Sequence, residues 1–204
     1  MAKKHDINLT VVKDIPTWVK AIIGIAIFVL ILGLWIGGTY NSFVGLDEGV
    51  NNAWGNVQSA YQRRADLIPN LVATVKAYSD YEGEVLTEIT NARASIGSAK
   101  TPEQMANADA EFNSALSRLL VVVENYPNLK ANENYLDLQA QLEGTENRIK
   151  VERDVYNTAV RAYNTKARRF PSNIIAGMFG FEQKEYFESQ EGSENAPDVN
   201  GLFK

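Results

Sequence analysis

The sequence contains no cysteine and only one histidine, His5. Without cysteine there can be no disulfide, thiolate zinc site, iron–sulfur cluster or cysteine nucleophile, and one histidine excludes any site that needs two imidazoles. The chain also has no G-x-S-x-G elbow, glycine-rich phosphate loop, H-E-x-x-H motif or EF-hand loop. A catalytic function would depend on carboxylates, hydroxyls, lysine or arginine alone, and we find no catalytic constellation among them. We therefore expect a protein that is not an enzyme and that binds no cofactor and no metal.

An excess of positive charge is also missing, because 20 basic residues stand against 25 acidic ones and the net charge is −5. Proteins that hold nucleic acid neutralise its phosphates with lysine and arginine. Nucleic acid is therefore not an expected partner. A composition of 45% hydrophobic and 22% charged residues over 204 positions is that of a folded domain with appendages.

A long apolar run lies near the N-terminus. Residues 21–46 carry no charge, and residues 21–38, AIIGIAIFVLILGLWIGG, are almost entirely apolar. At about 1.5 Å per helical residue, roughly 20 such residues cross a hydrocarbon core of about 30 Å. We predict one transmembrane helix over 18–40, with Trp18 and Tyr40 near the two interfaces. A cleaved signal peptide is the alternative, but the run exceeds a usual h-region and no A-x-A-like site follows it.

The charges on the two sides of this helix differ in sign. Residues 1–20, which include the first residues of the helix, contain four lysines against two aspartates, and the first charges beyond the helix are Asp47 and Glu48. Because positively charged flanks stay in the cytoplasm, residues 1–17 should form a cytoplasmic arm. The expected location is the inner (cytoplasmic) membrane, single-pass, with the following domain in the periplasm or outside the cell. The lipid bilayer is thus an expected partner.

Gly33 and Gly37 form a G-x-x-x-G motif within the predicted membrane helix. Small residues at this spacing let two helices approach closely, so the motif predicts transmembrane packing in a homo-oligomer. The alternative is a chance occurrence, since glycine is common in membrane helices.

Helical periodicity continues after the anchor. From Phe43 to Tyr78 apolar residues recur in alternating steps of three and four, a heptad-like seam typical of coiled coils and bundles. Pro69 interrupts this seam and removes the hydrogen bond to residue 65, so we expect a kink or break there.

Three further helical segments follow the first. A short one spans about 85–96, the next begins at the capping sequence Thr101-Pro102-Glu103-Gln104, and the last runs over about 131–170. No alternating strand pattern occurs. Residues 41–181 are therefore predicted to be all-α, an up-and-down four-helix bundle with long first and last helices.

Arg64 occupies a position of the apolar seam in the first of these segments. If that segment pairs antiparallel with the last one, position 64 falls opposite about 149, within one turn of Glu146 and Glu152. A buried guanidinium needs such a carboxylate. We predict a structural polar layer of Arg64 with Glu146 or Glu152. The layer either sets the register of the helices or forms a ligand-binding or switchable site.

The C-terminal region changes character twice. Residues 174–181, IIAGMFGF, are strongly apolar and could fold back over the bundle end, touch lipid or dock a partner. Residues 182–204 carry six acids against two lysines, which predicts an acidic disordered tail.

Several strings of this chain resemble the LemA family. They are YNSFVGLDEGVNNAWGNVQSAYQRRADLIPNLVATVKAY from Tyr40, ENYPNLKAN from Glu124 and TENRIKVERDVYN from Thr145, of which RRADLIPNLV is the most specific. The resemblance runs from the anchor to Phe181. It implies a short N-terminal tail, one membrane helix and a helical-bundle domain, and it brings no established catalytic residues. One branch of the family is associated with magnetosome membrane formation.

These observations leave three functional hypotheses. The first is a membrane-anchored, non-enzymatic scaffold or adaptor of the bacterial envelope that presents its bundle to an unidentified membrane or envelope protein. The second is a membrane-shaping protein that acts on lipid. The third is an enzyme or ligand sensor built on the Arg64 layer.

Overall fold

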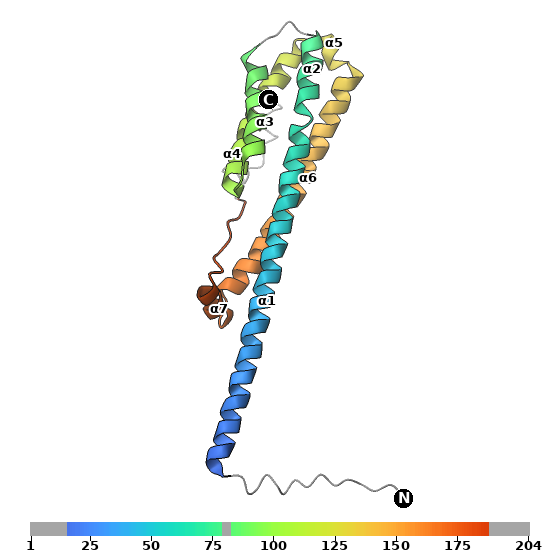
Figure 1. The fold of residues 1–204 in the computed structure, drawn as a ribbon. Helices are drawn as coiled ribbons and strands as arrows, with labels where there is room; N and C mark the ends of the chain where they lie inside the picture. The colour runs from blue at the N-terminus through green and yellow to red at the C-terminus, as the bar shows by residue number, and fades with distance from the viewer. Residues whose placement is uncertain (1–15, 79–82, 188–204) are drawn as a thin grey trace, which may run out of the picture.

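The computed structural model describes residues 16–78 and 83–187, and all secondary structure within these ranges is helical. The helices are α1 (Thr17–Ala65), α2 (Ile68–Tyr78), α3 (Glu84–Ser98), α4 (Pro102–Glu124), α5 (Pro127–Lys130), α6 (Glu133–Arg168) and α7 (Ser172–Phe179). Figure 1 shows one helix, α1, extending far beyond a bundle formed by the others. The predicted all-α class is confirmed.

Helix α1 joins the apolar run to the bundle without interruption over 49 residues, a length of about 74 Å. Its N-terminal half leaves its large apolar side chains exposed, as Phe28 at 65% and Leu34 at 71% illustrate. The helix meets the length and hydropathy needed to cross a membrane. An exposed apolar surface of this length is unfavourable in water and favourable in lipid, which indicates membrane anchoring.

The C-terminal half of α1 packs antiparallel against α6. Phe43 lies 6.1 Å from Tyr163 between ring centroids, and Trp54 lies 5.7 Å from Tyr156. Residue numbers rise along one helix as they fall along the other, which fixes both direction and register. The buried seam of α1 and the buried stripe of α6 thus form the centre of the core.

The helix breaks next to Pro69, as predicted. Helix α1 ends at Ala65 and α2 begins at Ile68. Proline has no N–H to donate to the carbonyl of Ala65. That carbonyl instead accepts a hydrogen bond from Arg93 Nε of α3 at 3.1 Å. The break therefore also ties α3 to the end of α1.

Helices α3 and α4 form a hairpin that covers only the part of the bundle far from the apolar half of α1 (Figure 1). The start of α4 follows the predicted cap, since Thr101 Oγ1 accepts a hydrogen bond from the Gln104 amide at 3.2 Å. The four predicted segments correspond to α1 with α2, α3, α4 and α6. The short helices α5 and α7 are additions that the four-helix prediction did not contain.

Residues 182–187 were predicted to begin a disordered tail, and this prediction is wrong because they pack against α6. The side-chain amide of Asn164 donates a hydrogen bond to the Lys184 carbonyl at 2.9 Å and accepts one from the Lys184 N–H at 2.8 Å. Asn157 forms the same pair of hydrogen bonds with the carbonyl and N–H of Phe187, at 3.0 and 2.9 Å. Phe187 is buried, 5.7 Å from Trp54 and 5.5 Å from Tyr156 between centroids. We call residues 182–187 the C-terminal strap. The rest of the predicted tail, 188–204, lies outside the described residues, as does the predicted arm up to residue 15.

Candidate functional site

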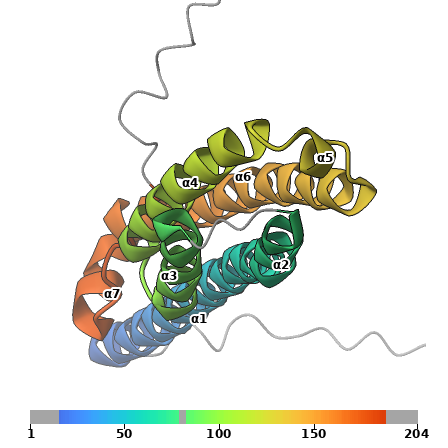
Figure 2. The same ribbon diagram turned by 90° about the horizontal axis from the view of Figure 1, so that it is seen from above.

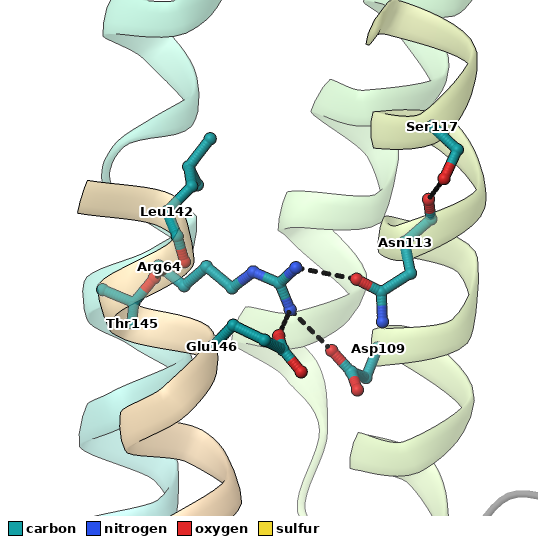
Figure 3. Close-up of polar contacts among 7 residues, drawn as sticks. All are labelled: Arg64, Asp109, Asn113, Ser117, Leu142, Thr145 and Glu146. Atoms are coloured by element: carbon teal, nitrogen blue, oxygen red, sulfur yellow. Dashed lines mark hydrogen bonds and ion pairs between the residues drawn. The ribbon is translucent and has the colours of Figure 1, made fainter. Parts of the chain in front are cut away.

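The most unusual polar group in the bundle is Arg64, whose residue surface is only 3% exposed. The apolar seam of α1 carries it into the core, where it faces α4 and α6. Its Nη1 lies 3.1 Å from Asp109 Oδ1 and 2.6 Å from Glu146 Oε2. Its Nη2 donates to Asn113 Oδ1 at 2.7 Å (Figure 3). One guanidinium thus joins three helices.

The polar layer has one of the two glutamates that the sequence places near Arg64. Glu146 contacts the guanidinium, whereas Glu152 lies 2.6 Å from Arg148 Nη2 one turn back on its own helix. Of the two predicted partners, Glu152 therefore does not belong to the layer, and the prediction is corrected on this residue. It follows Glu146 by six residues, so the helix turns its carboxylate to another side.

Two members of the layer, Asp109 and Asn113, were missed by sequence reasoning. They sit four residues apart on α4, directly after Ala108 and Phe112 of its apolar stripe. Residues at that spacing share one face of a helix. An acid and an amide at the edge of an apolar stripe were the available signal.

The layer holds two carboxylates for one guanidinium. Burial raises the pKa of the Asp109 carboxyl, although the positive charge of Arg64 opposes this shift and Glu146 adds to it. Burial, and then the negative charge of Asp109, raises the pKa of the neighbouring Tyr61 hydroxyl. The Arg64 guanidinium also stacks 4.5 Å from the centroid of the Phe112 ring. The environment therefore disfavours the ionised forms of Tyr61 and Asp109.

A pocket of about 350 Å³ opens beside this layer between α2, α4 and α6. Its apolar wall consists of Leu71, Leu116, Leu120, Tyr135 and Leu142, and Arg64 and Glu146 contribute its polar floor. We call this feature the α4–α6 groove. No three of the described histidine, aspartate and glutamate residues converge as metal ligands, in the groove or elsewhere.

Exposed apolar side chains also lie on α4 and α6 in the part of the bundle that holds the groove, and one of them, Leu120, lines it. They are Leu120 at 38%, Val121 at 63% and Leu136 at 49%. Figure 1 places this part of the bundle opposite the apolar half of α1. The chemistry of the groove is that of a recess for apolar side chains, with a polar floor in which Arg64 and Glu146 are paired.

Gly33 and Gly37 lie on the exposed apolar half of α1. Among residues 16–78 and 83–187, a methyl group added at either position would meet no heavy atom within 4 Å, apart from its own helical surroundings. Packing among these residues therefore does not account for the two glycines. Their predicted role in helix association stays a prediction.

A family model described as the LemA family matches residues 53–200 of this chain. The magnetosome protein MamQ 2 of Paramagnetospirillum magneticum is 27% identical, over 81% of this chain and 70% of the relative. The magnetosome protein MamQ of Magnetospirillum gryphiswaldense is 24% identical, over 74% of this chain and 65% of the relative. Protein LemA of Metamycoplasma hominis is 24% identical, over 92% of this chain and 88% of the relative.

Proposed function

Because the chain belongs to the LemA family and carries a membrane anchor in its longest helix, we propose that it is a membrane-anchored, non-enzymatic scaffold or adaptor of the bacterial envelope. In this proposal the inner membrane holds the anchor, the N-terminus is cytoplasmic, and the bundle binds an envelope protein on the other side. Association of two or more copies through the anchor would make the scaffold multivalent.

The observation that carries the proposal is the continuity of α1 from the apolar run into the core. A flexible linker would let the domain tumble, whereas a continuous helix fixes the distance and orientation of the domain relative to its anchor. Between Gly38 and Ala65 the helix rises about 40 Å. The α4–α6 groove is thereby held at a set height above the bilayer, which is the arrangement a scaffold needs.

The groove supports a protein partner more than a small ligand. The Arg64 guanidinium is already occupied by Asp109, Glu146 and Asn113. A small anion would have to displace a buried carboxylate, which is costly. An amphipathic helix of a partner, by contrast, could place apolar side chains against Leu116 and Leu120 and leave the ion cluster intact.

Site-specific photo-cross-linking in native membranes tests this function. A photoreactive amino acid at Leu120 should yield a discrete adduct with another envelope protein, identified by mass spectrometry. The same group at Ser114, which is exposed on the side of α4 facing α3, is the matched control and should not yield that adduct. Adducts of equal yield at both positions, or only with lipid, would refute the scaffold proposal for this groove.

Membrane shaping is the second candidate, favoured by the relatives that are named magnetosome proteins. It predicts that the full chain changes the form of vesicles into which it is reconstituted. Electron microscopy of such vesicles at increasing protein density separates the two functions. Tubules or a narrowed size distribution would support shaping, and unchanged spherical vesicles would leave the scaffold as the better account.

A further inference from the structure

Helix α7, together with Phe170 two residues before it, exposes apolar side chains that do not pack into the bundle core. Ile175 and Ala176 are buried against the core, while Phe170 is 77% exposed, Ile174 51% and Met178 68%. Ile174 and Met178 are four residues apart and share one face of α7. The helix thus has two apolar faces, and the described residues cover only one of them.

The position of α7 relates this uncovered face to the membrane. Phe179 and Phe181 lie 5.0 and 5.5 Å from the ring of Tyr40 between centroids, and Phe181 stacks on Phe43 at 4.8 Å. Tyr40 stands just beyond the uncharged apolar run of α1, which ends at Gly38. Figures 1 and 2 both place α7 beside this part of α1. When α1 spans a bilayer, α7 is therefore carried to the level of the lipid headgroups.

The core of the bundle reaches the same level. Ile36, inside the apolar run, is partly buried and packs against the hydrophobic core cluster. The preceding large apolar residues of α1 remain exposed. The lower edge of the bundle and the upper edge of the membrane span therefore overlap rather than being separated by a spacer.

The charges around α7 fit an anionic lipid surface. Arg168 and Arg169 are exposed and immediately precede Phe170. The nearest acid along α1, Asp47, is already paired with Lys184 at 2.7 Å. On the other side of α7, the exposed Glu182 follows three residues after its end, so two arginines stand against one adjoining acid. Apolar side chains flanked by arginines are characteristic of helices that lie in the membrane interface, where aliphatic and aromatic groups enter the acyl boundary and guanidinium groups reach phosphates.

We infer that Phe170, Ile174 and Met178 form a membrane foot, a second lipid contact that lies in the headgroup layer beside the anchor and prefers anionic phospholipid. The inference requires the membrane anchor but not the scaffold function. Two contacts on one leaflet restrain the tilt and rotation of the bundle, which a single spanning helix does not.

The absence of cysteine from the chain makes a direct test possible. Met178→Cys in the full-length protein is labelled with an environment-sensitive fluorophore and reconstituted into vesicles of phosphatidylcholine and phosphatidylglycerol. Lipids with a spin-label quencher just below the headgroup report contact. Val29→Cys in the anchor is the positive control, and Val121→Cys, 63% exposed on α4, is the solvent control.

The membrane foot predicts blue-shifted emission at position 178 and quenching several-fold stronger than at position 121. Blue-shifted emission without lipid quenching would show that protein covers α7 and would overturn the inference. Emission like that of position 121 would show a solvated helix and would also overturn it. Because quenching at position 29 reports the anchor separately, failure of the foot is distinguishable from failure of anchoring.

The preference for anionic lipid has its own test. Replacing Arg168 and Arg169 with glutamine, or omitting phosphatidylglycerol, should at least halve the quenching at position 178 and leave that at position 29 unchanged. Equal quenching at position 178 under all conditions would overturn the anionic preference.

Discussion

Arg64 and Asp109 lie 3.1 Å apart in the bundle interior, although 45 residues separate them along the chain. Their side chains are each only 4% exposed. Glu146, the third charged group, has a side chain that is 50% exposed. Water can therefore stabilise the charge of Glu146 but hardly that of Asp109. The Arg64–Asp109 pair is the desolvated part of the layer, and Glu146 is its solvated edge.

The first prediction is that Asp109, and not Glu146, dominates the energetic coupling to Arg64. Arg64→Met should lower the free energy of unfolding by about 3–5 kcal/mol, because it leaves a buried carboxylate without its partner. Adding Asp109→Asn should recover much of this loss, and adding Glu146→Gln much less. Urea unfolding of the full chain in detergent, followed by circular dichroism, measures the double-mutant cycle.

Glu152→Gln is the control for that cycle, since Glu152 is bound by Arg148 and not by Arg64. It should leave the effect of Arg64→Met unchanged. A loss below about 1 kcal/mol for Arg64→Met, the range of exposed pairs, would contradict the structural role of the layer.

The second prediction concerns pH. Burial raises the pKa of Asp109 above its ordinary value of 3.8. As the pH falls through the raised folded-state pKa towards 3.8, the folded state binds a proton that the unfolded state does not. This group therefore contributes stability on acidification and loses that contribution as the pH rises.

The comparison with Asp109→Asn isolates this contribution. The free energy of unfolding of the unaltered protein, minus that of the variant, should increase as the pH falls through the folded-state pKa of Asp109 towards 3.8. Thermal or urea unfolding at several pH values measures it. A difference that does not change with pH, or that shrinks on acidification, would contradict the assigned direction.

The third prediction tests association through the anchor. Gly37→Leu should weaken a homo-oligomer in detergent, because the larger side chain separates the two helices. Gly24 is nine residues from Gly33, so it lies on the opposite side of α1. Gly24→Leu is therefore the matched control, and it should leave association unchanged. Native mass spectrometry measures the stoichiometry, and a strict monomer of the unaltered protein would refute the prediction.

The fourth prediction tests the C-terminal strap. Phe187→Ala removes a ring that is 4% exposed, and truncating a buried phenylalanine typically costs about 3–5 kcal/mol. Because the strap follows the last helix, the cost should appear as local release rather than global unfolding. Proteolysis within residues 182–187 should become faster. Tyr186→Ala is the control, since Tyr186 is 41% exposed and its loss should change little.

The fifth prediction concerns topology. With the three lysines of the N-terminal arm, residues 1–17, held in the cytoplasm, protease added to intact spheroplasts should digest the bundle. A cytoplasmic marker protein should survive the same treatment. Protection of the bundle until lysis would reverse the orientation.

Local pattern was enough to predict most of the fold. An uncharged run longer than 18 residues identifies the anchor, the steps of three and four identify the seam, and Pro69 identifies the break. These features depend only on the helical repeat and on the missing N–H of proline. The burial of Arg64 follows from the same repeat, since a residue on the seam must enter the core. The approach of Glu146 follows from the antiparallel register of two long helices.

Tertiary structure decided what the repeat leaves open. The identity of Asp109 as the buried partner depends on how α4 is placed against α1, and the intervening turns set that placement. The strap depends on Asn157 and Asn164 meeting backbone groups of residues about 20 to 30 positions away, a match that hydropathy does not encode. The position of α7 along α1 likewise depends on where α6 ends, which places α7 beside Tyr40. Periodicity determines which side of a helix is buried, whereas the partner on that side is determined by the packing of the whole chain.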